Sequence, residues 1–516
     1  MNAKMTMKAV AILAAMAAGT AMAAEPAPKV SVTVDLKGEM GPIRLMNAVN
    51  NGPAVAPVRG DQKRGNFEEY KAARIPFART HDAINCVSGG AHCCDIDAIF
   101  PDFDADENDP KSYDFVFTDH YLDSMVRAGT KPYFRLGQTI EHGPKKYGVL
   151  PPKDYAKWAR ICEHVIRHYN EGWAWGVDTA QTTMNIAWSN QFGIVYWEIW
   201  NEPDLDPYDD ITKNISPRCW GGTVTNFFNF YETAARHLKA KFPKLKIGGP
   251  AICGRVEWGR RFLDYCRDRK VPLDFFSWHG YSRWPSHTQS LCKMWRDELD
   301  KRGFQKVESI YNEWNYVKGW GDDWVYSLRA ESGDLNLKGA AFIAGVMIDC
   351  QNAPVDMIMF YDARANCGMN NLFDKTTLWP TKGYYPYLAW AKLLDLGTQV
   401  PCRITEGLQE DVKAATGVVD ESKKEKVVPG GFTAVAAKAK KGKGGAVFVT
   451  RYSDDDNASE TGLLSVRVPG VDLAKAKARC HVTDLIRSNT EVPLMFQPDG
   501  SALVKMMPLS FAIVEW

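Results

Sequence analysis

The chain has 516 residues, of which 45% are hydrophobic and 24% are charged, with 63 Lys and Arg against 62 Asp and Glu. This balance excludes a disordered or collagen-like chain and a strongly basic nucleic-acid-binding protein, because apolar residues are ample and the net charge is near zero. The length allows roughly two to four domains, or one large barrel with an attached domain. Aromatic residues make up 12% of the chain; their flat faces suit sugars, but they also suit large cores.

The first residues have the pattern of a secretory signal peptide. Lys4 and Lys8 precede the apolar run 9–18, and the Ala-Met-Ala triplet 21–23 is a small-residue cleavage site. We therefore expect residues 1–23 to be removed and the protein to be exported, to a periplasm or outside the cell. No later apolar stretch approaches the roughly 20 residues that span a bilayer. After cleavage we expect neither membrane nor nucleic-acid partners.

All 12 cysteines lie after the predicted cleavage site. An even number in an exported chain permits disulfides, and we expect some bridges, most readily among Cys86, Cys93 and Cys94. A zinc site would need C-x-x-C pairs or a nearby set of histidines, and His92 beside Cys93 matches no standard spacing. We expect no metal and no cofactor.

Residues 43–396 alternate short apolar runs with longer amphipathic stretches, which is the pattern of repeated βα units. The eight predicted strands are residues 43–49, 77–80, 131–137, 194–200, 246–250, 274–279, 307–312 and 356–361. Predicted helices between them include residues 155–169, 224–242, 291–301 and 337–350. Eight such units predict an α/β fold, a (β/α)8 TIM barrel, over residues 37–396.

The composition changes after residue 396. Lys- and Gly-rich stretches alternate there with strand-like runs at 446–450, 463–468, 478–482 and 511–516. This pattern predicts an accessory C-terminal β-sandwich over residues 397–516, joined by an N-terminal strand from residues 29–36.

Two of the predicted barrel strands run into a glutamate. The fourth is followed by Asn201-Glu202-Pro203 and the seventh by Glu313-Trp314. Such a barrel carries its site at the C-terminal ends of its strands, and the fourth and seventh strands lie on opposite sides, so we expect Glu202 and Glu313 to face each other across the mouth. Hydrolysis of a glycosidic bond needs two carboxyl groups with separated pKa values, one as proton donor and one on the other face of the sugar. Spacing alone does not say which glutamate does which.

A family resemblance supplies that order. The segment Glu-Ile-Trp-Asn-Glu-Pro-Asp at 198–204, with Glu313 in Asn-Glu-Trp-Asn at 312–315, resembles the paired signatures of retaining glycoside hydrolases of clan A. It is most similar to family 39, the β-xylosidase and α-L-iduronidase family, and residues 113–137 resemble that family's approach to its third strand. The resemblance covers residues 43–396. It implies that Glu202 is the acid/base, Glu313 the nucleophile, and Asn201 a partner of the sugar hydroxyl beside the anomeric carbon.

Other strand ends supply candidate contacts to the substrate. These are Arg79, His81, His142, His279, Tyr281, Tyr361 and Trp314. His279 is the preferred histidine, because clan A enzymes often place a histidine or aromatic residue here near the nucleophile. Arg79 is alternatively a partner that orients Glu313, since a guanidinium favours the ionised carboxylate.

Two further features have both a binding and a structural interpretation. Trp200, Trp314 and Trp379 either form a stacking platform for a sugar or pack in the core. Arg364 either binds the carboxylate of a uronic acid or pairs with an acid such as Asp362.

Together these features predict an exported retaining exo-glycosidase, xylosidase- or arabinofuranosidase-like, that releases terminal sugars through a glycosyl-enzyme intermediate. The expected partner is an oligosaccharide or polysaccharide substrate. Two alternatives stay open. One is a non-catalytic glycan-binding barrel, and the other is a metal-dependent barrel hydrolase, although His81, His142 and His279 form no recognised ligand motif.

Overall fold

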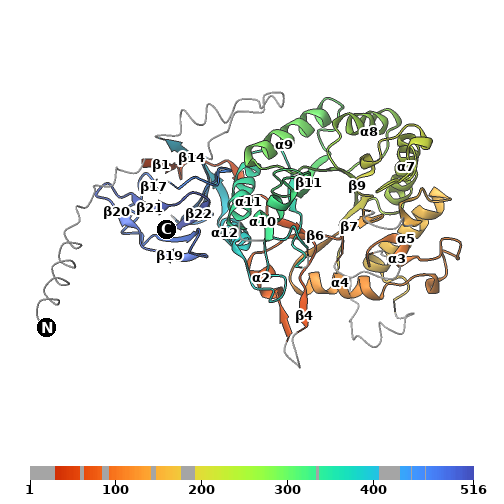
Figure 1. Cartoon of the computed structure of the whole chain (residues 1–516), viewed down its shortest axis with the longest axis horizontal. Coiled ribbons are helices and arrows are strands. Elements are labelled where there is room, and N and C mark those ends of the chain that lie inside the picture. Colours follow the sequence, from red (N-terminus) through yellow and green to blue (C-terminus); the bar gives the residue numbers. More distant parts are fainter. Residues whose placement is uncertain are drawn as a thin grey trace, which may run out of the picture.

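The computed structural model describes residues 29–57, 63–83, 92–140, 147–175, 192–332, 336–365, 367–405, 431–442, 444–459 and 461–516. The predicted signal peptide, Cys86 and His142 lie outside these ranges. Figure 1 shows a ring of helices around a barrel of strands, with a smaller body of sheets beside it. Among the described residues, no helix combines the length and the apolar content that crossing a bilayer requires.

Eight parallel strands close into a barrel in the order β10-β11-β12-β3-β6-β7-β8-β9. Their bounds are β3 Ala48–Asn50, β6 Phe77–Arg79, β7 Lys131–Leu136, β8 Tyr196–Ile199, β9 Lys246–Ile252, β10 Phe275–His279, β11 Glu308–Trp314 and β12 Met357–Phe360. The predicted TIM barrel is therefore confirmed. The largest shift of a boundary is at β3, which begins five residues later than predicted because residues 43–47 only lead into the barrel.

Side chains from the strand starts fill one end of the barrel. A buried cluster there contains Ala48, Tyr133, Tyr196, Phe275, Ile310, Met357 and Met359. Because successive residues of a strand point to opposite faces, Glu198 follows Tyr196 on the interior face, one layer nearer the C-terminal end of β8. The apolar cluster thus forms the floor beneath a polar layer.

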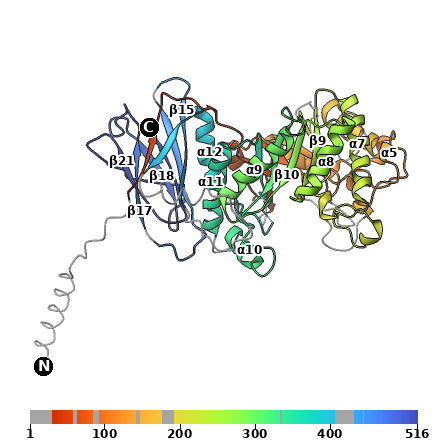
Figure 2. The same cartoon turned by 90° about the horizontal axis from the view of Figure 1, so that it is seen from above.

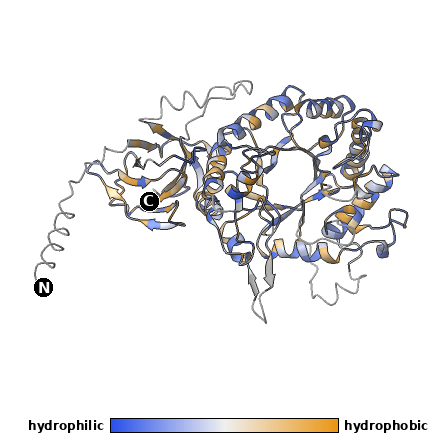
Figure 3. Ribbon diagram, in the orientation of Figure 1, coloured by the Kyte–Doolittle hydropathy of each residue, from blue (hydrophilic) through white to orange (hydrophobic). Residues whose placement is uncertain are grey.

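Amphipathic helices surround the barrel. The α-helices are α2 Phe67–Ala72, α3 Ile96–Ile99, α4 Val116–Arg127, α5 Tyr155–Glu171, α7 Val224–Lys241, α8 Val256–Arg269, α9 Pro285–Asp300, α10 Trp324–Ser332, α11 Asn336–Gln351 and α12 Tyr385–Leu396. Short 3-10 turns occupy Pro110–Ser112, Tyr147–Val149, Pro203–Leu205, Ile211–Lys213 and Lys382–Tyr384. Figure 3 shows hydrophilic and hydrophobic residues side by side along the ring helices, as expected when one stripe faces the strands.

The termini of α5 illustrate why the sequence forms these helices. The Asp154 side chain accepts hydrogen bonds from the backbone N–H groups of Ala156 and Lys157, which satisfies two donors of the first turn. The helix ends where Gly172 adopts a φ of 81°, a left-handed conformation that glycine adopts without steric cost.

The second body is a β-sandwich of two sheets, ordered β14-β1-β17-β21-β20 and β19-β18-β22-β16-β15-β13-β2. Its strands are β1 Lys29–Val34, β2 Gly41–Pro42, β13 Gly397–Val400, β14 Cys402–Thr405, β15 Phe432–Ala439, β16 Gly445–Arg451, β17 Gly462–Arg467, β18 Arg479–Thr483, β19 Thr490–Val492, β20 Met495–Phe496, β21 Ala502–Met506 and β22 Ser510–Glu515. The N-terminal strand β1 lies between β14 and β17. The short strand β2, which sequence patterning missed, pairs with β13. A separate hairpin joins β4 Val55–Pro57 to β5 Lys63–Gly65.

Helices α11 and α12 lie between the barrel and the sandwich (Figure 2). Almost every residue of α11 is buried, which explains why this helix is apolar on all sides rather than amphipathic. At Gly345, α11 packs tightly between α9 and β16, because a Cβ atom there would lie 2.8 Å from Pro285 of α9 and 3.7 Å from Thr450 of β16. The two bodies therefore share one packed interface.

The cysteines differ from the sequence-based expectation. All eleven described cysteines are free thiols, so the expected bridges do not form among them. The sulfur atoms of Cys93 and Cys94 are 3.9 Å apart, about twice the S–S bond length of ~2.05 Å. Most of these cysteines are buried, and they pack as small hydrophobic side chains.

Candidate active site

Glu202 and Glu313 meet in one cavity at the C-terminal ends of β8 and β11. Both are almost fully buried, with exposed fractions of 6% and 3%. One carboxylate oxygen of each lies within 4.8 Å of the other, and one nitrogen of His279 shares that space. The cavity has a volume of about 1610 Å³ and is also lined by His81, Asp82, Tyr281 and Tyr361.

Unusual backbone geometry turns Glu202 into this cavity. Trp200 has a φ of 78° and Glu202 a φ of 47°, both in the left-handed region that non-glycine residues seldom occupy. The Trp200 indole consequently leaves the barrel interior and packs against Trp220 and Phe230 at ring-centroid distances of 5.2 Å. The backbone N–H of Glu202 is held by the Ala251 carbonyl at 2.9 Å. Strained backbone of this kind is found at functional sites, where the surrounding structure supports it.

His279 touches both glutamates from the neighbouring strand. The register between β10 and β11 shifts after Trp278, so that His279 pairs with Glu313, and such irregularities re-aim side chains at the ends of strands. His279 Nδ1 lies 2.6 Å from Glu202 Oε1 and 3.4 Å from Glu313 Oε2. Its Nε2 has no hydrogen-bond partner among the described residues.

Arg79 lies directly beneath the site and is completely buried. Its guanidinium donates to Glu198 Oε2 at 2.6 Å, to Glu313 Oε1 at 2.7 Å and to Asn201 Oδ1 at 2.5 Å. The prediction that Arg79 contacts substrate is therefore wrong, because these protein groups cover its donors. Its alternative role, orienting Glu313, matches the observed contact.

Glu198 is a member of the site that sequence reasoning did not assign. Its Oε1 accepts hydrogen bonds from Asn312 Nδ2 at 2.6 Å and from the Tyr133 hydroxyl at 3.3 Å. It balances the charge of Arg79 inside the barrel. The available signal was a charged residue within an otherwise apolar strand, four positions before Glu202.

Burial shifts the protonation of both carboxyl groups. Removal from water, reinforced by the charge of Asp204, raises the pKa of Glu202 to about 8. Removal from water also raises the pKa of Glu313 to about 7, against the opposing effects of His279, Arg79 and the hydrogen bond from Tyr281. Both carboxyl groups are thus easier to protonate than a glutamate in water, Glu202 the more so. Burial lowers the pKa of His279 to about 4, so this imidazole is neutral at pH 7.

The remaining polar residues line the cavity wall. His81 Nε2 lies 3.7 Å from Glu313 Oε1 and 3.4 Å from Asp82 Oδ1. The Tyr361 hydroxyl donates to Asp82 Oδ2 at 2.6 Å, and Asp82 is a second residue that sequence reasoning missed. Asn201 Nδ2 is buried and has no partner among the described residues, which leaves an amide donor for a ligand.

Comparison with known proteins identifies the family of this chain. Residues 47–368 match the family model described as glycosyl hydrolases family 39. The chain belongs to glycosyl hydrolases family 39. A beta-xylosidase of Geobacillus stearothermophilus is 30% identical over 203 residues, which are 37% of this chain and 35% of that protein. A beta-xylosidase of Caldicellulosiruptor saccharolyticus is 26% identical over 278 residues, 51% of each chain. The chain thus spans about a third to a half of the length of these curated relatives.

Solved structures resemble the whole family 39 chain in fold. The glucosidase from Croceicoccus marinus superposes with a TM-score of 0.65 at 20% identity, covering 95% of this chain and 99% of that one. A monomeric beta-xylosidase from Caulobacter crescentus CB15 gives a TM-score of 0.61 at 15% identity, with coverage of 94% and 99%. The likeness extends through the barrel and the sandwich.

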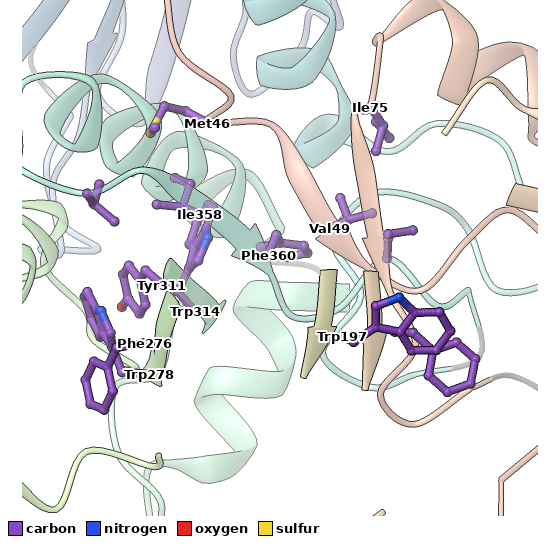
Figure 4. Packing of buried hydrophobic residues seen from close by; sticks show 14 of the residues in the cluster. Met46, Val49, Ile75, Trp197, Phe276, Trp278, Tyr311, Trp314, Ile358 and Phe360 are labelled. Atoms are coloured by element: carbon purple, nitrogen blue, oxygen red, sulfur yellow. The ribbon is translucent and has the colours of Figure 1, made fainter. Parts of the chain in front are cut away.

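The tryptophans of this family 39 site are distributed differently from the prediction. Trp314 is fully buried and packs against Phe360 at a centroid distance of 5.3 Å, among the other buried side chains in Figure 4. The prediction that it contacts substrate is wrong, because a register shift between Tyr311 and Trp314 turns Glu313 into the barrel and leaves Trp314 on the outer face of β11. Trp379 is 62% exposed and does not line the cavity. The aromatic residues at the cavity rim are instead Trp320 and Trp324.

Arg364 pairs with protein groups at the end of β12. Arg364 lies 3.2 Å from Asp362 Oδ2 and donates to the Asp82 carbonyl at 2.6 Å, so its structural interpretation is the one observed.

Within the described ranges, Glu202, His279 and Glu313 are the group whose atoms converge closely enough to hold a metal ion. One oxygen of this group is already paired, since the Arg79 guanidinium lies 2.7 Å from Glu313 Oε1.

Proposed function

We propose that this family 39 protein is a retaining exo-glycosidase that releases a terminal sugar by double displacement. The observation that carries the proposal is the close approach of Glu202 and Glu313, whose nearest carboxylate oxygens lie within 4.8 Å. Retaining enzymes hold their two carboxyl groups about 5 to 5.5 Å apart, whereas inverting enzymes separate them by roughly 6.5 to 9.5 Å to admit a water molecule. The spacing favours direct attack by one carboxylate.

In the first step, a Glu313 oxygen attacks the anomeric carbon while the bond from that carbon to the leaving oxygen breaks. Glu202 gives its proton to the leaving oxygen, so the aglycone departs as an alcohol and an ester joins the sugar to Glu313. In the second step, Glu202 takes a proton from water and the resulting hydroxide oxygen attacks the anomeric carbon. The ester bond breaks, Glu313 is again a carboxylate, and the anomeric configuration is retained.

The surroundings of each glutamate support this division of roles. Glu313 accepts hydrogen bonds from Arg79 at 2.7 Å and from the Tyr281 hydroxyl at 2.8 Å, and donors of this kind favour the ionised form. Among the residues that the structure describes, no guanidinium pairs with Glu202, and its burial favours the protonated form. The free amide of Asn201 is placed beside the acid/base, where a hydroxyl of the bound sugar would accept its hydrogen bond.

The substrate class follows from the relatives. The beta-xylosidases of Geobacillus stearothermophilus and Caldicellulosiruptor saccharolyticus are 30% and 26% identical to parts of this chain, and an alpha-L-arabinofuranosidase from Thermotoga maritima shares the fold at 15% identity. We therefore propose a terminal xylose or arabinofuranose on an oligosaccharide or polysaccharide.

Aryl glycosides test the proposal. Purified protein is assayed with p-nitrophenyl β-D-xylopyranoside, α-L-arabinofuranoside, β-D-glucopyranoside and α-L-iduronide, and NMR follows the anomer formed first. We expect retention on a pentoside. The Glu313→Gln variant should lose ester formation on every substrate, and Glu202→Gln should still form the ester from a 2,4-dinitrophenyl glycoside, whose leaving group needs no acid.

The matched control is Glu68→Gln, because Glu68 is exposed and does not line the cavity, so this variant should leave all rates unchanged. Equal losses of Glu202→Gln on good and poor leaving groups would contradict the acid/base role. Sugar binding without hydrolysis of any substrate would instead favour the glycan-binding alternative.

Export is part of the same proposal. It is supported by the basic residues, apolar run and small-residue triplet of positions 1–23. N-terminal sequencing of protein from the native cells should begin near Ala24, and an intact Met1 on the functional protein would contradict it.

A further inference from the structure

A pair of stacked tryptophans stands at the rim of the cavity, on the segment that follows β11. Trp320 and Trp324 have ring centroids 5.1 Å apart and planes inclined by 22°. Trp320 remains 61% exposed despite this contact. A rigid pair of indoles that leaves a large apolar face in water marks a binding surface more often than it marks a core.

Tyr281 lies between the tryptophan pair and the carboxylate of Glu313. Trp320 meets Tyr281 edge to face, with centroids 5.1 Å apart and planes at 82°. The hydroxyl of Tyr281 in turn donates to Glu313 Oε2 at 2.8 Å. Trp320 and Trp324 line the same cavity as Glu202 and Glu313. The exposed indole therefore adjoins the position of the sugar on its outward side.

Hydrogen bonds hold the start of this segment in place. The Val317 N–H donates to the Ser282 carbonyl at 3.1 Å, which joins the segment to the residue after Tyr281. The Ser327 hydroxyl accepts from the Lys318 N–H at 3.0 Å and donates to the Asp323 carbonyl at 3.1 Å. An indole that is fixed before a ligand arrives loses little conformational entropy on binding.

We infer that Trp320, supported by Trp324, forms the subsite for the leaving group of the substrate, which is a pyranose ring or another group with a flat apolar face. The inference rests on the proposed function. The polar residues around Glu202 and Glu313 suit the hydroxyl-rich terminal sugar, and an exo-acting enzyme leaves the rest of its substrate at the rim. Aromatic faces pack against the C–H face of such a ring and exclude water there.

The test compares leaving groups that differ in whether they can stack. Wild-type, Trp320→Ala and Trp320→Phe proteins are assayed with the p-nitrophenyl glycoside, a disaccharide and the glycosyl fluoride of the sugar found in the panel above. Trp379→Ala is the matched control, since Trp379 is equally exposed at 62% and does not line the cavity.

For Trp320→Ala we expect kcat/KM to fall about tenfold on the disaccharide and the aryl glycoside, the upper end of what an aromatic contact contributes. The fluoride has no ring to stack, so its kcat/KM should stay within about twofold. Trp320→Phe should recover part of the loss. Where hydrolysis of the ester limits turnover, kcat should not change, because the leaving group has already departed.

An equal loss on the fluoride would overturn the inference, because Trp320 would then act only by supporting Tyr281. No loss on any substrate, or an equal loss in Trp379→Ala, would overturn it as well. If the wild-type protein hydrolyses nothing, the proposed function fails and the subsite is tested by binding. Calorimetric titration with xylotriose must then show affinity at least about fivefold weaker for Trp320→Ala, and unchanged affinity would reject the subsite.

Discussion

Arg79 organises the site from a single side chain. Its three nitrogens reach Glu198, Glu313 and Asn201 within 2.7 Å. Removing a guanidinium and two carboxylates from water is costly, and the arrangement is stable only because the charges pair at hydrogen-bond distance. In the proposed mechanism, Arg79 therefore orients both the nucleophile, Glu313, and the amide of Asn201 that would bind the sugar.

The pKa order of the two glutamates predicts a bell-shaped pH dependence of kcat/KM. Below pH about 7, Glu313 takes up a proton and cannot attack, and above pH about 8, Glu202 loses the proton it must donate. In Glu202→Gln, assayed with a 2,4-dinitrophenyl glycoside, the alkaline limb should disappear and the acidic limb should remain. A persistent alkaline limb near pH 8 in this variant would show that another group causes it.

The raised pKa of Glu202 also makes the stability of the folded protein depend on pH. Because the folded protein binds the Glu202 proton more tightly than the unfolded chain does, this group's contribution is complete below its ordinary pKa near 4.5. The contribution is lost as the pH rises toward about 8. Urea unfolding between these pH values should therefore show a smaller pH dependence in Glu202→Gln than in the wild-type protein.

At the scale of whole elements, β11 shows how far sequence patterning reaches. Apolar runs followed by polar residues predicted all eight barrel strands. Strict alternation from the inward-facing Ile310 and Asn312, however, would place Glu313 outward and Trp314 inward. Because both Glu313 and Trp314 follow an apolar run, the sequence predicts that both side chains contact the substrate. The register shift between Tyr311 and Trp314, which depends on the pairing with β12, instead turns Glu313 inward and Trp314 outward.

Other features of the site have no local sequence signal. The positive φ of Trp200 moves its indole off the interior face that alternation predicts, and the register shift after Trp278 brings His279 beside Glu313. Both depend on neighbouring strands rather than on the segment itself. The rim position of Trp320 arises in the same way, from contacts of its loop with residues distant in the chain.

At the scale of the whole molecule, a buried lysine is one of the contacts that join the sandwich to the rim of the cavity. Lys338 on α11 is 1% exposed, and its Nζ donates to the Asp454 carbonyl at 2.8 Å and lies 2.5 Å from Asp456 Oδ1. Both acids belong to the sandwich segment after β16. Their side chains also accept from the hydroxyls of Tyr316 and Tyr326, which flank the tryptophan pair. The sandwich thus supports the loop that carries Trp320.

Replacing this lysine should therefore affect stability and the rim together. Lys338→Met removes the hydrogen bond to the Asp454 carbonyl and one of the two cations beside the Asp454 carboxylate, leaving Arg283 Nε at 3.6 Å. We expect the free energy of unfolding in urea to fall by about 1.5 to 3 kcal/mol. Asp454→Asn in the same background should recover part of that loss, because the carboxylate that lost a cation is gone. Lys71→Met, which breaks an exposed pair with Glu68, should cost less than about 1 kcal/mol. Because the tryptophan loop loses its anchor, KM should rise for the disaccharide more than for the glycosyl fluoride. A Lys338→Met protein as stable as the Lys71→Met control would show that the sandwich and barrel hold together without this contact.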